Sequence, residues 1–191
     1  MKPSGMQRFT AVLFFALLVS PCALAVIPDL GASYATLPST FIPGYGTGAA
    51  DVFSEVFTSA SSDDYIYTYI ISGSQVNLSY FSVELLPGAG VYDWGVDGVL
   101  NQPAVWDLVN DPPESIDALF LDPIGPGDTS ATLWFKSPYA PVTAEGALTG
   151  ITGGSYNFLV GEVLTPQVPE PATWMLICIG GLLGRVSRKR K

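Results

Sequence analysis

The residue types that enzymes most often use for nucleophilic and acid–base chemistry are scarce in this chain of 191 residues. It contains no His and only two Cys, Cys22 and Cys178. A Ser-His-Asp triad, a Cys-His pair and every zinc site built on His are therefore excluded. Lys136 is the one basic residue in the interior of the chain, and a solvated strand position suits it better than the role of a catalytic amine.

Carboxylates are the remaining candidates for catalysis. Two of them hydrolyse a glycoside when one acts as the acid and the other as base or nucleophile. Nothing in the sequence places two Glu side chains together, so we expect ordinary surface carboxylates and no enzyme. The candidates for the acid are Glu84, Glu114, Glu145 and Glu162.

Calcium is the one cofactor that the composition would suit, because it needs only oxygen ligands. The Asp residues do not follow the spacing of an EF-hand, and Asp is also a common turn residue. We therefore expect no firm metal site, with calcium as the alternative. Its candidate ligands are Asp93, Asp97, Asp122 and Asp128, with Asp107, Asp111 and Asp117 as a further group.

Aromatic side chains offer a third kind of site, a flat platform on which sugar rings stack. A Trp in a strand more often belongs to a core, where it buries about 150–250 Å². The two interpretations differ in whether the rings are exposed on one face of a sheet. The candidates are Trp94, Trp106 and Trp134, with the row Tyr65, Tyr67 and Tyr69.

Basic and acidic residues are segregated along the chain. Seven of the eight basic residues lie in the first eight or the last seven positions. Residues 26–169 hold sixteen Asp and Glu against one Lys, a net charge of −15. Such a body repels nucleic acid and anionic lipid headgroups, so we expect neither as its partner.

The first 25 residues have the three-part pattern of a secretory signal. Two basic residues precede an apolar run over residues 9–19, and small side chains follow at Ala23 and Ala25. We expect signal peptidase to cleave after Ala25. A lipoprotein signal ending at Cys22 is the alternative, but Pro21 stands where a small residue is needed.

A second signal lies at the other end, over residues 168–191. Val168, Pro169, Glu170 and Pro171 precede an apolar run over 172–184, for which we expect a short helix. The run covers about 20 Å of a hydrocarbon core that is about 30 Å thick. A basic tail follows, and the positive-inside rule places it in the cytoplasm and the body outside. The basic residues are Arg185, Arg188, Lys189, Arg190 and Lys191.

This order of Pro-Glu-Pro, apolar segment and basic tail resembles the PEP-CTERM sorting signal of exopolysaccharide-producing Gram-negative bacteria. The stretch Val168–Met175 is similar to a variant in which Ala-Thr-Trp follows Pro-Glu-Pro. The resemblance implies recognition of Pro169, Glu170 and Pro171 by a membrane-embedded exosortase, with the basic tail as the stop signal. It also implies cleavage near that motif. An ordinary single-span anchor is the alternative.

The body over residues 26–164 contains neither Cys, so its packed core must stabilise it. Short alternating segments, punctuated by Gly, Pro and Asp about every ten residues, predict an antiparallel β-sandwich of Ig-like or jelly-roll type. Residues 26–48 are expected to form an irregular lead-in and 165–167 a linker. Strands are expected at 51–58, 64–71, 76–85, 91–94, 104–108, 118–121, 129–136, 146–151 and 155–164.

Two details predict the local path of the chain. The Ser72-Gly73-Ser74 segment indicates a hairpin turn. The apolar phase changes between Tyr80 and Phe81, which indicates a bulge or a strand that crosses between sheets.

We therefore expect an exported, single-domain protein, held briefly in the inner membrane by its C-terminal segment and then presented at the cell surface or outside the cell. A non-enzymatic structural or adhesive role is the first hypothesis. A carbohydrate-binding module for exopolysaccharide is the alternative, and a glycoside hydrolase is a distant one. An exposed aromatic pair would favour binding, and two carboxylates about 5 to 10 Å apart in a cleft would favour hydrolysis.

Overall fold

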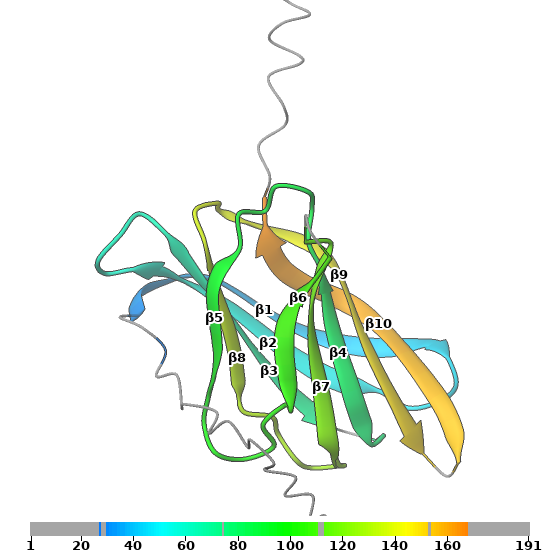
Figure 1. Ribbon diagram of the computed structural model, residues 1–191. Coiled ribbons are helices and arrows are strands. Elements are labelled where there is room, and N and C mark those ends of the chain that lie inside the picture. Colours follow the sequence, from blue (N-terminus) through cyan, green and yellow to red (C-terminus); the bar gives the residue numbers. More distant parts are fainter. Residues whose placement is uncertain (1–26, 28–29, 74, 111–112, 153, 168–191) are drawn as a thin grey trace, which may run out of the picture.

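The computed structural model describes residues 27, 30–73, 75–110, 113–152 and 154–167 (Figure 1). Within these ranges the chain forms ten strands and no helix, so the all-β prediction is confirmed. The strands are β1 (Leu30–Tyr45), β2 (Ala50–Ser59), β3 (Tyr65–Gly73), β4 (Leu78–Glu84), β5 (Tyr92–Asp97), β6 (Val105–Val109), β7 (Ser115–Ile124), β8 (Thr132–Ser137), β9 (Pro141–Thr152) and β10 (Ser155–Pro166).

The ten strands form one antiparallel sheet in the order β5-β8-β3-β2-β1-β10-β9-β4-β7-β6. We call β5, β8, β3, β2 and the start of β1 the first half, and the end of β1 with β10, β9, β4, β7 and β6 the second half. Strand β1 joins them, because residues 30–41 pair with β2 and residues 42–45 pair with β10. The end strands β5 and β6 lie near each other, so the sheet nearly closes into a barrel (Figure 1). The expected two separate sheets are therefore one continuous, coiled sheet.

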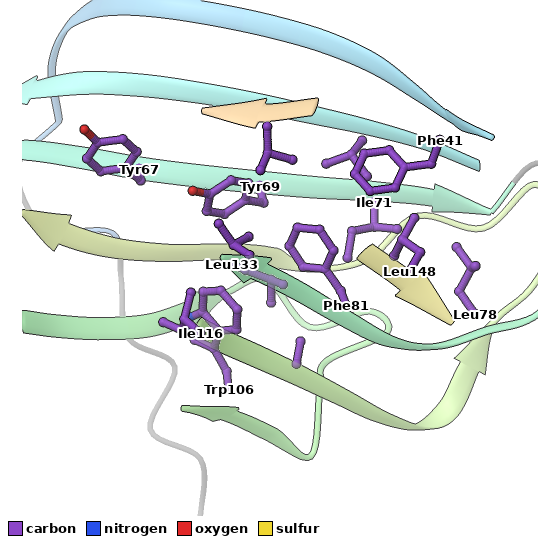
Figure 2. Packing of buried hydrophobic residues seen from close by; sticks show 14 of the residues in the cluster. Phe41, Tyr67, Tyr69, Ile71, Leu78, Phe81, Trp106, Ile116, Leu133 and Leu148 are labelled. Atoms are coloured by element: carbon purple, nitrogen blue, oxygen red, sulfur yellow. The ribbon is translucent and has the colours of Figure 1, made fainter. Parts of the chain in front are cut away.

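One hydrophobic core fills the space between the two halves. At its centre the ring centroids of Tyr69 on β3 and Phe81 on β4 are 5.7 Å apart, and Figure 2 shows both rings within the core. The Tyr69 ring also lies 5.9 Å from Phe135 and 6.5 Å from Trp106. Rings from both halves thus meet around one tyrosine, and their burial is the main source of stability in a body without disulfides.

The alternation predicted for β3 is confirmed. Tyr67, Tyr69 and Ile71 face the core, while Ile66 and Thr68 are buried on the opposite side of the strand. Both faces of β3 are covered, as the apolar residues of both phases predict for a central strand.

The end of β10 is fastened to the body by side chains from other strands. The Tyr69 hydroxyl donates a hydrogen bond of 2.6 Å to the carbonyl oxygen of Leu164, and the Leu164 N–H donates to the Ser54 hydroxyl. Thr165 is fully buried and donates to the carbonyl oxygen of Glu84. The linker expected at 165–167 is therefore wrong for Thr165 and Pro166, which belong to β10 and pair with Val142 and Pro141 of β9.

The irregular lead-in expected over residues 26–48 is wrong for Leu30–Tyr45, which form strand β1. It runs for 16 residues and contains Pro38 and Pro43. Residues 30–41 pair with a strand on one side only, and at such an edge the missing N–H of Pro38 need not cost a ladder hydrogen bond. The prolines that suggested irregular structure are thus compatible with a strand.

The hairpin expected at Ser72-Gly73-Ser74 is also wrong. Strand β3 pairs with β2 and β8, whereas β4 pairs with β7 and β9, so the chain passes there from the first half to the second. The bulge is confirmed as a register shift between Leu78 and Tyr80. It turns Tyr80 away from the core, whereas Leu78 and Phe81 are buried.

Two glycines allow the two halves to approach closely beside β1. Gly146 and Gly161 are direct partners on β9 and β10, and the ring of Phe41 lies against both. A Cβ at Gly161 would lie 2.5 Å from the Phe41 ring, and one at Gly146 would lie 3.0 Å from it. Side chains at these positions would therefore displace a fully buried phenylalanine.

The predicted signal peptide, the C-terminal helix at 172–184 and the basic tail lie outside the described residues. In the ranges that the structure describes, no helix is long and apolar enough to cross a membrane.

Candidate functional site

An aromatic and apolar row crosses the whole outer face of the second half, on the side away from the core. Residues that pair directly in an antiparallel sheet point to the same face, so the register alone brings these side chains into line. We call this set the tyrosine row. From β1 to β6 its members are Tyr45, Phe158, Thr149, Tyr80, Leu119 and Val105.

Several apolar side chains in and beside the tyrosine row are exposed. Tyr45 is 69% exposed, and Leu119 and Val105 are also exposed. Tyr156 and Ile151 pair directly beside the row and are exposed as well. A contiguous apolar surface of this kind marks an interaction site more often than isolated exposed residues do.

Tyr80 is held in place at the middle of the row. Its hydroxyl donates a hydrogen bond to one carboxylate oxygen of Asp117 on β7, and the Ser82 hydroxyl donates to the other at 2.7 Å. Burial, followed by the hydrogen bond to Asp117, raises the pKa of Tyr80 to about 12. The phenol is therefore protonated at neutral pH, and its ring is fixed before any ligand arrives.

Two pairs of carboxylates face each other on the outer face, one of them next to the row. Asp107 pairs directly with Asp117, and farther along the face Glu145 pairs directly with Glu162. Like charges at directly opposite positions are unfavourable for the sheet itself. The only Lys or Arg among the described residues is Lys136, which lies on β8 in the first half. These carboxylates thus remain as hydrogen-bond acceptors on the outer face.

Two shallow hollows lie at the two ends of this face. One of 330 Å³ is lined by Tyr80, Leu119 and Val105 together with Asp107 and Asp117. The other, of 420 Å³, lies around Glu145 and Glu162. Its further lining residues are Ser39, Thr40, Ile42, Thr143, Ala144, Val160 and Gly161. The outer face can therefore pack flat apolar groups along the row and accept hydrogen bonds at both ends.

The structure brings together two of the four Glu residues considered for hydrolysis. Glu145 and Glu162 are exposed on the surface of the sheet, whereas the acid of a glycosidase is commonly set in an apolar enclosure. Glu114 lies apart from them, where it accepts a hydrogen bond from Asn110, and Glu84 lies at the end of β4.

The three Trp residues do not form a platform. Trp106 packs in the core, and Trp134 is 2% exposed. Trp94 is 37% exposed on the end strand β5. Tyr67 and Tyr69 are core residues as well, and Tyr65 is partly buried against the core. Most of the aromatic residues that the sequence indicated are thus buried, because strand position decides which rings are covered, and a binding role for Trp94 stays a prediction.

Among the Asp residues considered for calcium, Asp107 and Asp117 pair directly, whereas Asp93, Asp97, Asp122 and Asp128 are spread over the body. Asp93 forms an ion pair with Lys136 at 3.0 Å, and Asp97 lies at the other end of β5. Asp122 is on β7, and Asp128 closes a turn with Gly125. No group of three acidic side chains suited to a metal occurs in the part of the chain that the structure covers. Calcium binding stays an untested alternative.

The aromatic residues that the sequence reasoning missed are Tyr45, Tyr80, Tyr156 and Phe158. In the sequence these aromatics stand beside others that are buried, such as Phe41 on β1 and Phe81 on β4, and nothing local separates the two kinds. The row becomes visible once the register of six strands is known, and the bulge before Tyr80 moves that residue to the outer face.

The residues of the two predicted signals, Ala23 and Ala25 at one end and 168–191 at the other, lie outside the described ranges. Comparison with curated proteins finds no match to this chain, and comparison with solved structures finds none either. A family model for the PEP-CTERM protein-sorting motif matches residues 167–191. The match begins at Gln167, whose N–H donates a hydrogen bond to Ala140 directly after β10. The chain thus carries the PEP-CTERM protein-sorting motif at the end of its last strand.

Proposed function

We propose that this is a non-enzymatic protein of the cell surface or the extracellular matrix, with a structural or adhesive role. The sorting motif at residues 167–191 carries the proposal, because it marks an exported substrate of an exosortase. The body is delivered to the outside, and the C-terminal segment is needed only until exosortase has cut near Pro169–Pro171.

The properties of the body support a role outside the cell. Its net charge of −15 over residues 26–169 keeps it soluble and keeps copies apart. The core and the hydrogen bonds at the end of β10 stabilise it without a disulfide. Its distinctive surface is the outer face of the second half, which suits binding better than catalysis because its hollows are shallow and its carboxylates are exposed.

Export through the motif is tested with the full chain and a Glu170→Ala variant in the producing cells. The parent protein should be found outside the inner membrane in shortened form, and Glu170→Ala should leave most of it in the inner-membrane fraction at the longer length. Glu162→Ala is the matched control, since it removes one exposed carboxylate from β10 and should be processed like the parent. Equal processing of all three proteins would contradict recognition of the Pro-Glu-Pro segment.

A further inference from the structure

We propose that the outer face of the second half binds a neutral polysaccharide chain, which lies along the tyrosine row. This inference rests on the proposed function, because export is what brings the face into contact with polysaccharides outside the cell. It assigns the binding to Tyr45, Tyr80, Tyr156 and Phe158, in place of the Trp residues that the sequence suggested.

The shape of the face fits an extended ligand. The row crosses six neighbouring strands, which at 4.7–4.9 Å per strand gives a length of about 24 Å. The hollow around Tyr80, Leu119 and Val105 lies at one end of this length and is open to solvent, whereas the hollow around Glu145 and Glu162 lies off the row, farther along β9 and β10. A small ligand would use the first hollow alone, whereas a chain lying along the row can contact this hollow and the aromatic residues on β4, β10 and β1.

The chemistry of the face fits sugar rings. Aromatic rings present large apolar surfaces on which the C–H faces of a pyranose can pack. Asp107 and Asp117 beside the row accept hydrogen bonds from sugar hydroxyls, and Glu145 and Glu162 offer further acceptors away from the row on the same face. Such charge-assisted hydrogen bonds are stronger than neutral ones. Apolar packing and acceptors thus occur together on one surface.

The negative charge of the outer face limits the classes of ligand that this face can bind. An acidic polysaccharide or a nucleic acid would meet five carboxylates on this face and no described cation. A second copy of the protein would bring the same negative charge against it, which opposes self-association. The carboxylates are Glu84, Asp107, Asp117, Glu145 and Glu162. A neutral, hydroxyl-rich polysaccharide chain is not repelled by these carboxylates.

The centre of the face is organised before binding. Asp117 holds the Tyr80 hydroxyl, and the Ser82 hydroxyl holds Asp117, so the ring and the carboxylate keep their places without a ligand. A surface whose side chains are already ordered loses less entropy when it binds.

The test is affinity electrophoresis of the processed protein collected from outside the cells. Native gels contain hydroxyethyl cellulose, laminarin or galactomannan as neutral probes, and alginate as the acidic one. We expect at least one neutral probe to retard the protein and alginate to leave it unretarded. Tyr156→Ala combined with Tyr45→Ala should weaken the retarding affinity at least about tenfold.

Tyr34→Ala is the matched control, because Tyr34 and Tyr156 are both 55% exposed, and Tyr34 lies in the part of β1 that pairs with β2. It should bind like the parent. The site is refuted if no neutral probe retards the parent, if alginate alone does, or if Tyr34→Ala weakens binding as much as the double variant. A dimer in sedimentation that Tyr156→Ala dissolves would instead make the face a protein interface. Failure to find the protein outside the cells would refute the proposed function itself.

Discussion

Trp106 on β6 donates a hydrogen bond from its indole Nε1 to the carbonyl oxygen of Trp134 on β8, at 3.1 Å. The two strands lie near opposite ends of the sheet, β6 as the last strand and β8 as the neighbour of β5. The hydrogen bond thus crosses the gap between the two ends of the sheet, where β5 and β6 do not pair and the barrel stays open. We call this gap the seam. The ring of Trp106 also packs beside Tyr69, so the same side chain joins the seam to the core.

Replacing Trp106 should therefore destabilise the body more than replacing an exposed tryptophan. Trp106→Phe removes a buried hydrogen bond and part of a buried ring, at a cost of about 1–3 kcal/mol. Trp94→Phe, on the partly exposed end strand, should cost no more than about 0.5 kcal/mol. Urea denaturation measures both, and equal midpoints would contradict the role of the seam.

The buried hydroxyl of Tyr69 provides a second test, because it joins β3 to the end of β10 across the core. Tyr69→Phe keeps the ring but leaves the Leu164 carbonyl without this donor, which should cost about 1–2 kcal/mol. Tyr34→Phe removes a hydroxyl from an exposed ring and should leave the midpoint unchanged. If the two variants unfold at the same urea concentration, the hydrogen bond contributes nothing.

Because β9 and β10 lie close to Phe41, replacing Gly161 should destabilise the body more than replacing Gly146. Gly161→Ala should destabilise the body by about 1–3 kcal/mol, because its Cβ would overlap the ring of a fully buried residue. Gly146→Ala should cost less, since its Cβ would lie farther from the same ring. Thermal unfolding of both variants gives the order, and a reversed order would contradict the packing around Phe41.

Stability should fall at alkaline pH. Burial, followed by hydrogen bonds to carboxylates, raises the pKa values of Tyr80 and Tyr92 to about 12, whereas the pKa of an unfolded Tyr is about 10. Between these values the unfolded chain loses protons that the folded protein keeps, so the stabilisation present below pH 10 is lost as the pH rises toward 12.

Urea midpoints at pH 8, 10 and 11 measure this loss. The urea midpoint of Tyr80→Phe should fall less between pH 8 and pH 11 than that of the parent, because one of the phenols responsible for the loss has been removed. A steeper decline in Tyr80→Phe would contradict the raised pKa of Tyr80.

The sequence predicted most strands well, since the period-2 alternation and the Gly, Pro and Asp turns are local signals. It also located the bulge before Phe81 through the change of apolar phase. It missed the strand character of β1, where the spaced prolines suggested irregular chain. The crossing after β3 was missed too, because a Ser-Gly-Ser turn suits a hairpin and a crossing equally.

The candidate site could not be predicted from local sequence patterns. Trp106 and Trp134 resemble platform residues in sequence, and only their place in the folded sheet shows that they are buried. Tyr45 and Val105 are 60 residues apart in the chain and come into one row through five strand pairings. No spacing in the sequence encodes that alignment. The sorting motif, in contrast, is a short contiguous pattern, and it was identified from its residues alone.

The central claim is that the body alone remains after passage through export and sorting, and the intact mass of the protein recovered from outside the cells tests it most directly. The mass should correspond to a chain that begins at Val26 and ends near the Pro169–Pro171 segment, without the basic tail. A mass that includes residues 1–25 or the tail through Lys191 would contradict it.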